Sequence, residues 1–297
     1  MKKIHRSVAA AALSLPVLLL SGCLFTTRRL PVPRAPSMVQ TVTPNDLVER
    51  LNQRWGAMQT LNATVEIQAS VLKTKEGVAK DYTTFRGHIL MRKPEQLRVL
   101  GQVPVLGMTM FDMASDGRNF TLYIPSKKKA VEGSTTLTKK SASRIENMRP
   151  GFFFDAMVVR GLEPDDEYMV TADTDTVEDA SKKHLLLVPE YILSIMRRKK
   201  GSQELAPVRV ITFHRDDLLP YKQDLYDSDG NLETEVSYRR YRDFGDGTYP
   251  STVTIRRPLD EYQAVLTVEK VVENMPLTDD QFHIKVPEGT LIQSLEK

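Results

Sequence analysis

The feature that most constrains the fold is an alternation of apolar and polar residues with a period of two. Val65, Ile67, Ala69 and Val71 alternate with polar side chains over residues 64–71. This pattern is typical of a β-strand with one buried and one solvated face. It recurs between turn signals and predicts strands over 64–71, 85–91, 97–100, 108–114, 119–124, 168–171, 184–190, 208–214, 222–226, 233–242, 251–257, 263–272 and 283–286.

Two helical patterns interrupt the strands. The first is predicted over 44–60, because Thr43 suits an N-cap, Pro44 suits the first helical turn, and apolar residues then recur at helical spacing. The second is a strongly apolar run over 152–159, preceded by a weaker helical signal over 141–149. Roughly a dozen strands with such helices predict a mainly β fold of the α+β class, a curved antiparallel sheet with helices covering one face.

The first 22 residues have the basic start and apolar run of a secretory signal peptide. The next residues complete the sequence Leu20-Ser21-Gly22-Cys23, which resembles a bacterial lipobox, the motif at which the cysteine is lipidated and becomes the new N-terminus. Leu24 rather than aspartate follows, which resembles an outer-membrane address. The alternatives are an ordinary signal with a chance cysteine or a short membrane anchor.

This interpretation divides the chain into three parts. We expect a signal peptide over 1–22, an acylated Cys23 with a proline-rich tether over 23–43, and a single domain over 44–297. Since Cys23 is the only cysteine, the domain holds no internal disulfide. The formal charge of +3 is matched by Lys2, Lys3 and Arg6 of the signal peptide, so the rest is formally neutral and bulk charge gives no argument for nucleic-acid binding.

The sequence lacks the common motifs that carry catalytic residues. The histidines are scattered and none lies in a zinc-protease motif, and neither a nucleophile elbow nor a P-loop occurs. The segment 227–230 opens like a calcium loop but lacks the glutamate at its twelfth position, which is Tyr238. The basic runs 127–129 and 197–200 are typical of solvated loops, with docking as the alternative. We therefore expect no catalytic residue, no metal, no cofactor and no enzymatic activity.

Apolar sequence also occupies a position where a polar turn is usual. Val103, Pro104, Val105, Leu106 and Gly107 connect two predicted strands. An apolar loop on a surface tends to mark a contact with a membrane or a partner. The alternative is a loop that folds onto its own core.

The second helix carries the other candidate site. Phe152, Phe153, Phe154 and Met157 make it apolar enough either to be plain core or to line or plug a lipid-sized cavity on the open face of the sheet.

Short segments at 51–53, 103–107, 160–164, 279–282 and 286–289 carry a resemblance to a known family. On these motifs the chain resembles the LolA/LolB-like superfamily of bacterial lipoprotein sorting, and most closely its outer-membrane receptor. The resemblance implies an incomplete antiparallel β-barrel with helices plugging its mouth, an apolar cavity for lipoprotein acyl chains, and a membrane-active leucine at Leu106.

The function implied by this resemblance is the binding of lipoprotein acyl chains and their insertion into the outer membrane. The expected partners are those chains, the membrane that holds the lipid anchor, and a periplasmic LolA-like carrier, with the protein a monomer on the periplasmic face of the outer membrane. The alternatives are a sensor or carrier of another lipid, and a structural envelope lipoprotein without a lipid cavity.

Overall fold

The computed structural model describes residues 39–73, 78–104, 106–135, 150–178, 185–245 and 247–295. The predicted signal peptide, Cys23, most of the tether, the helical signal at 141–149 and Val105 lie outside these residues. The chain forms two compact units, residues 1–37 with 175–188 and residues 38–174 with 189–297, and the site below belongs to the second.

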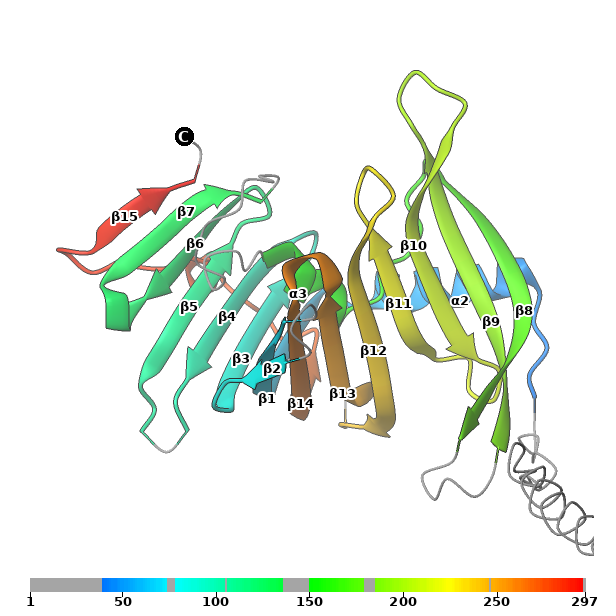
Figure 1. Ribbon diagram of the computed structural model, residues 1–297, viewed down its shortest axis with the longest axis horizontal. Coiled ribbons are helices and arrows are strands. Elements are labelled where there is room, and N and C mark those ends of the chain that lie inside the picture. The colour runs from blue at the N-terminus through cyan, green and yellow to red at the C-terminus, as the bar shows by residue number, and fades with distance from the viewer. Residues whose placement is uncertain are drawn as a thin grey trace, which may run out of the picture. The chain divides into compact units, whose positions relative to one another are not determined.

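One large sheet organises the described residues (Figure 1). Its strands are β1 (Thr60–Lys73), β2 (Val78–Asp81), β3 (Phe85–Arg92), β4 (Gln96–Gln102), β5 (Thr109–Ser115), β6 (Asn119–Ile124), β7 (Lys129–Ser134), β8 (Asp166–Glu178), β9 (Leu185–Arg198), β10 (Leu205–His214), β11 (Pro220–Tyr226), β12 (Leu232–Asp243), β13 (Thr248–Arg257), β14 (Tyr262–Glu273) and β15 (Leu291–Ser294). Their order is β15-β7-β6-β5-β4-β3-β1-β14-β13-β12-β11-β10-β9-β8, with β2 paired to β1. Within the described residues the two end strands do not pair with each other, so the barrel is incomplete, as predicted.

The helix α2 (Pro44–Ala57) begins as the sequence predicts. Thr43 and Asp46 form a capping box, each side chain accepting a hydrogen bond from the other residue's backbone N–H. The helix ends before its predicted limit because Thr60 already begins β1. Leu47, together with Val48 and Leu51, packs on buried side chains of β9 and β10.

The helix α3 (Pro150–Met157) covers the same face of the sheet as α2. Residues opposite one another in a ladder share a face, and Ile211 on β10 lies opposite Gln223, which lies opposite Val236 on β12. Ile211 packs in the cluster under α2, and Val236 packs in the cluster that holds α3. The prediction that helices cover one face is therefore confirmed. No helix in the described part of the chain is both long enough and apolar enough to cross a membrane.

The predicted strand at 283–286 is wrong. A short 3-10 helix, η5 (Asp279–Phe282), lies on the sheet face opposite the helices, where the Arg98 guanidinium donates to the Gln281 carbonyl at 3.1 Å. Residues 283–286 follow it without strand pairing. The alternation in this segment reflects packing onto that face, since Phe282 is buried beneath the Arg92 guanidinium. The chain joins the sheet later, as β15, and pairs parallel with β7, so the sheet is not purely antiparallel as expected.

The strand predicted to end at residue 190 continues as β9 to Arg198. The basic run was interpreted as a loop, but Arg197 and Arg198 belong to the strand. Arg197, Arg198 and Lys199 form ion pairs at 2.6–2.8 Å with Asp166, Glu167 and Glu204. These carboxylates, the first two from the neighbouring strand β8, offset the repulsion that would disfavour a run of cations.

Candidate functional site

The apolar segment 103–107 is a short loop between β4 and β5 whose ends are tied together. The Val103 N–H donates to the Met108 carbonyl at 2.8 Å, and the Gly107 N–H donates to the Val103 carbonyl at 3.1 Å. Gly107 has a φ of 63°, a left-handed conformation that glycine adopts without strain. Leu106 is 69% exposed and Met108 is 62% exposed. The leucine therefore contributes no packing to the core, and Pro104 beside it is also exposed.

The residues predicted to line a cavity all belong to α3. Phe153, Phe154 and Met157 are each 1% exposed, and they share one hydrophobic cluster with strands from both halves of the sheet. Phe152 stacks on Phe153 with ring centroids 4.4 Å apart. A hollow of about 50 Å³ adjoins Met157, and a larger one of about 860 Å³ is bordered by Phe152 and polar side chains such as Asp155 and Arg160.

Polar side chains of the sheet hold the end of α3. The last carbonyls of a helix lack partners within it, and here the Gln223 amide donates to the Asp155 carbonyl at 2.8 Å while the Tyr249 hydroxyl donates to the Met157 carbonyl. Burial raises the pKa of the Tyr249 hydroxyl, which keeps it a donor. The Arg160 guanidinium pairs with the Asp155 carboxylate, whose pKa burial raises. The sequence did not predict these polar contacts to α3, because Gln223 and Tyr249 come from strands far from the helix in the chain.

Tyr249→Phe should lower the free energy of unfolding by about 1–3 kcal/mol, because the Met157 carbonyl would stay buried without a partner. It should also loosen α3, which Trp55 reports because this sole tryptophan lies edge-on to Phe154 at 6.4 Å. Urea unfolding and acrylamide quenching measure the two effects. Tyr191→Phe is the matched control, since its hydroxyl accepts from the Val42 N–H near α2. Equal quenching changes in both variants would argue against a specific hold on α3.

The end of the tether is attached to the domain, which the sequence did not predict. The Gln40 N–H donates to the Arg215 carbonyl at 2.7 Å, and the Arg215 guanidinium donates back to the Gln40 carbonyl at 3.2 Å. The guanidinium also lies 4.7 Å from the centre of the Tyr191 ring. The described chain therefore begins at a point that is held to the domain.

The known proteins that resemble this chain are only distantly similar to it. No family model matches the chain, and no curated protein matches it. A LolA superfamily protein from Nitrosomonas europaea aligns with 82% of this chain and 99% of its own at 14% identity and a TM-score of 0.49. A DUF1329 family protein from Desulfovibrio piger aligns with 80% of this chain and 95% of its own at 16% identity and a TM-score of 0.49.

A putative outer membrane lipoprotein-sorting protein domain from Vibrio parahaemolyticus aligns with 80% of this chain and 94% of its own, at 11% identity and a TM-score of 0.45. Similarity of this degree does not place the chain in a family. The functional case therefore depends on the chain's own residues.

Proposed function

We propose that this protein is a lipid-anchored, non-enzymatic protein on the periplasmic face of the outer membrane that binds lipoprotein acyl chains and helps to insert lipoproteins into the membrane. The observation that carries the proposal is Leu106, a large apolar side chain exposed at the tip of a loop closed by its own main-chain hydrogen bonds. The sequence that resembles a lipobox implies the lipid anchor. The resemblance to the LolA/LolB-like superfamily implies that the cargo is a lipoprotein.

The exposed leucine has a physical use at a membrane. Burying one leucine side chain is worth roughly 1.5–3 kcal/mol, and Leu106 leaves this free energy unused in water because it is 69% exposed. A carrier that crosses the periplasm gains by avoiding membranes, whereas a protein that delivers cargo gains by entering one.

The acyl chains would take the place of α3. Each acyl methylene gains about 0.8 kcal/mol on leaving water, so chains in transit need an apolar surface that shields them. The sheet face under Phe153, Phe154 and Met157 is such a surface, and α3 covers it in the structure. We propose that α3 is a plug that cargo displaces, at the cost of the bonds from Gln223 and Tyr249.

Leu106→Glu tests the proposal. The variant should keep the thermal stability of the wild type, because the side chain lies outside the core, and it should slow the release of bound lipoprotein into liposomes about tenfold or more. Leu259→Glu is the matched control, since Leu259 is 57% exposed on a different turn. A normal transfer rate in the Leu106 variant would favour a lipid sensor or a structural lipoprotein instead.

A further inference from the structure

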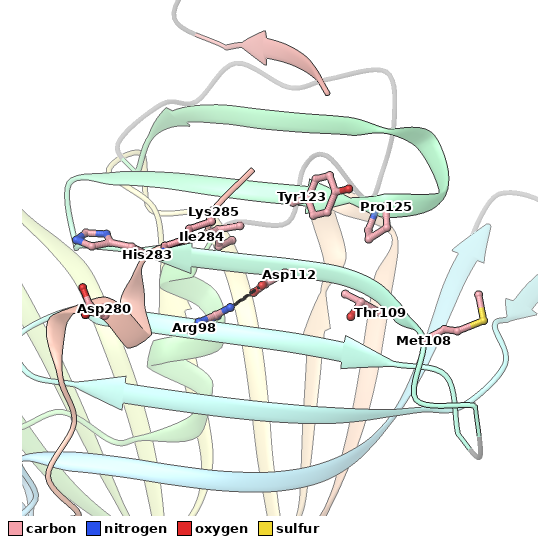
Figure 2. Close-up of a pocket in the computed structure, with 10 residues that line it drawn as sticks. All are labelled: Arg98, Met108, Thr109, Asp112, Tyr123, Pro125, Asp280, His283, Ile284 and Lys285. Atoms are coloured by element: carbon pink, nitrogen blue, oxygen red, sulfur yellow. Dashed lines mark hydrogen bonds and ion pairs between the residues drawn. The ribbon is translucent and has the colours of Figure 1, made fainter. Parts of the chain in front are cut away.

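A hollow of about 770 Å³ lies on the sheet face opposite the helices (Figure 2). Its floor holds the Arg98–Asp112 ion pair, and its wall includes Ile284 and Lys285 from the C-terminal segment. Figure 2 shows Met108 and Thr109 at one end of the hollow and Asp280 and His283 at the other, with the ion pair between them. The hollow therefore opens beside the loop that carries Leu106.

The floor of the hollow is electrically balanced. The Arg98 guanidinium donates to both carboxylate oxygens of Asp112, at 3.0 and 2.7 Å, and to the Gln281 carbonyl. Asp112 offsets its charge and three of its N–H groups have acceptors, so it does not attract a ligand strongly. Lys285 differs, because it is exposed and no ion pair joins it to another described residue. Among the described residues that line the hollow, Lys285 is therefore the cation available to a ligand.

A second lysine lies at the same end of the strands as Leu106. Strands β4, β5, β6 and β7 alternate in direction, so the β4–β5 loop and the β6–β7 turn are at one end of the sheet. Adjacent strands are about 4.8 Å apart, which places the turn roughly 10 Å from the loop. Lys128 occupies this turn, is exposed, and forms no ion pair with another described residue.

Further exposed apolar side chains lie at this end. The Leu291 N–H donates to the Lys128 carbonyl at 2.9 Å, which places the start of β15 beside the turn. Leu291 and Ile292 are both more than half exposed. Leu106, Met108, Lys128 and Leu291 together form what we call the loop edge. Exposed apolar side chains with interspersed lysines are typical of surfaces that enter the headgroup region of a membrane.

We propose that the loop edge binds anionic phospholipid, with the lipid phosphate held between Lys128 and Lys285 at the mouth of the hollow while Leu106 lies among the acyl chains. The inference rests on the proposed membrane contact of Leu106 and adds the class of lipid. The Asp280 carboxylate lies at the far end of the hollow from Met108, so a phosphate that enters beside the loop stays away from this negative charge (Figure 2).

The test compares binding to vesicles of phosphatidylcholine with and without phosphatidylglycerol. All variants are exported with an ordinary secretory signal and carry Cys23→Ser, so that an acyl anchor does not mask the effect. Lys128→Gln with Lys285→Gln should weaken binding to the anionic vesicles by about fivefold for each lysine and leave binding to neutral vesicles unchanged. The control pair, Lys200→Gln with Lys270→Gln, removes the same charge from exposed positions away from the hollow.

An equal loss in the control pair, or wild-type binding by the Lys128 and Lys285 variant, would overturn the inference. Inorganic phosphate added at constant ionic strength should not release the protein, and release would indicate a site for free phosphate instead. If wild type prefers neither vesicle but Leu106→Glu still weakens both, the proposed function stands and the anionic-lipid inference fails. If wild type binds neither vesicle, the proposed function fails as well.

Discussion

Phe153→Ala should lower the free energy of unfolding by about 3–5 kcal/mol, the usual cost of removing a buried phenylalanine ring. Phe153 is 1% exposed, and its ring contacts Phe152 within the cluster that joins α3 to the sheet. Because the ring is buried among apolar side chains, its removal leaves an apolar cavity. Urea unfolding measures the loss.

The same variant distinguishes a plug from ordinary core. Phe111→Ala is the matched control, because Phe111 is equally buried but lies on β5, where its ring packs against Phe85. Both variants should lose stability. If α3 is a plug, weakening its hold shifts the population toward the open form, and a fluorescent acyl probe should bind the Phe153 variant more tightly than the Phe111 variant. Equal probe binding at equal stability would assign Phe153 to the core alone.

The sequence was most informative where a local interaction decides the structure. The capping box of Thr43 and Asp46 fixes the start of α2, and the turn residues 227–231 fix the β11–β12 connection through the Asp227 carboxylate, which accepts from the Asn231 N–H at 2.9 Å. The Asp227 carboxylate, which begins the segment that resembles a calcium loop, thus accepts hydrogen bonds from the backbone of its own turn. Period-two alternation located most strands because one face of the sheet is buried.

The features that the sequence did not predict depend on contacts between residues far apart in the chain. The alternation at 283–286 could not reveal that Phe282 packs on a sheet face and that the chain pairs only at Leu291. The hollow beside the loop has walls from β4 to β6 and from residues 280–285, which no local pattern relates. The attachment of Gln40 to Arg215 likewise joins positions 175 residues apart.

At the candidate site, the exposure of the β4–β5 loop could be predicted from the sequence, whereas the role of α3 could not. An apolar connection predicted an exposed contact, and the structure leaves Leu106 exposed because the loop closes on its own backbone. The apolar helix left core and cavity roles open. The structure packs Phe154 into the core, and whether α3 opens depends on a difference in free energy that burial alone does not give.

Replacing Cys23 by serine should remove most of the protein from the membrane fraction while leaving the domain folded. The variant is exported with an ordinary cleavable signal, so that no uncleaved segment anchors it. Each acyl methylene contributes about 0.8 kcal/mol of membrane affinity, far more in total than the roughly 1.5–3 kcal/mol of one leucine. The described contacts begin at Gln40 and the chain has no other cysteine, so folding does not depend on this sulfur.

The affinity that the Cys23→Ser protein retains for membranes then measures the contribution of the β4–β5 loop. A single apolar side chain gives weak, reversible binding, whereas stable attachment takes two signals. Cys23→Ser should therefore sediment with liposomes only at high lipid concentration, and adding Leu106→Glu should abolish that fraction, while circular dichroism melting stays the same for both. A Cys23→Ser protein that remains in the membrane fraction after a salt wash would defeat the lipid anchor. Liposome binding that survives Leu106→Glu would move the membrane contact away from the β4–β5 loop.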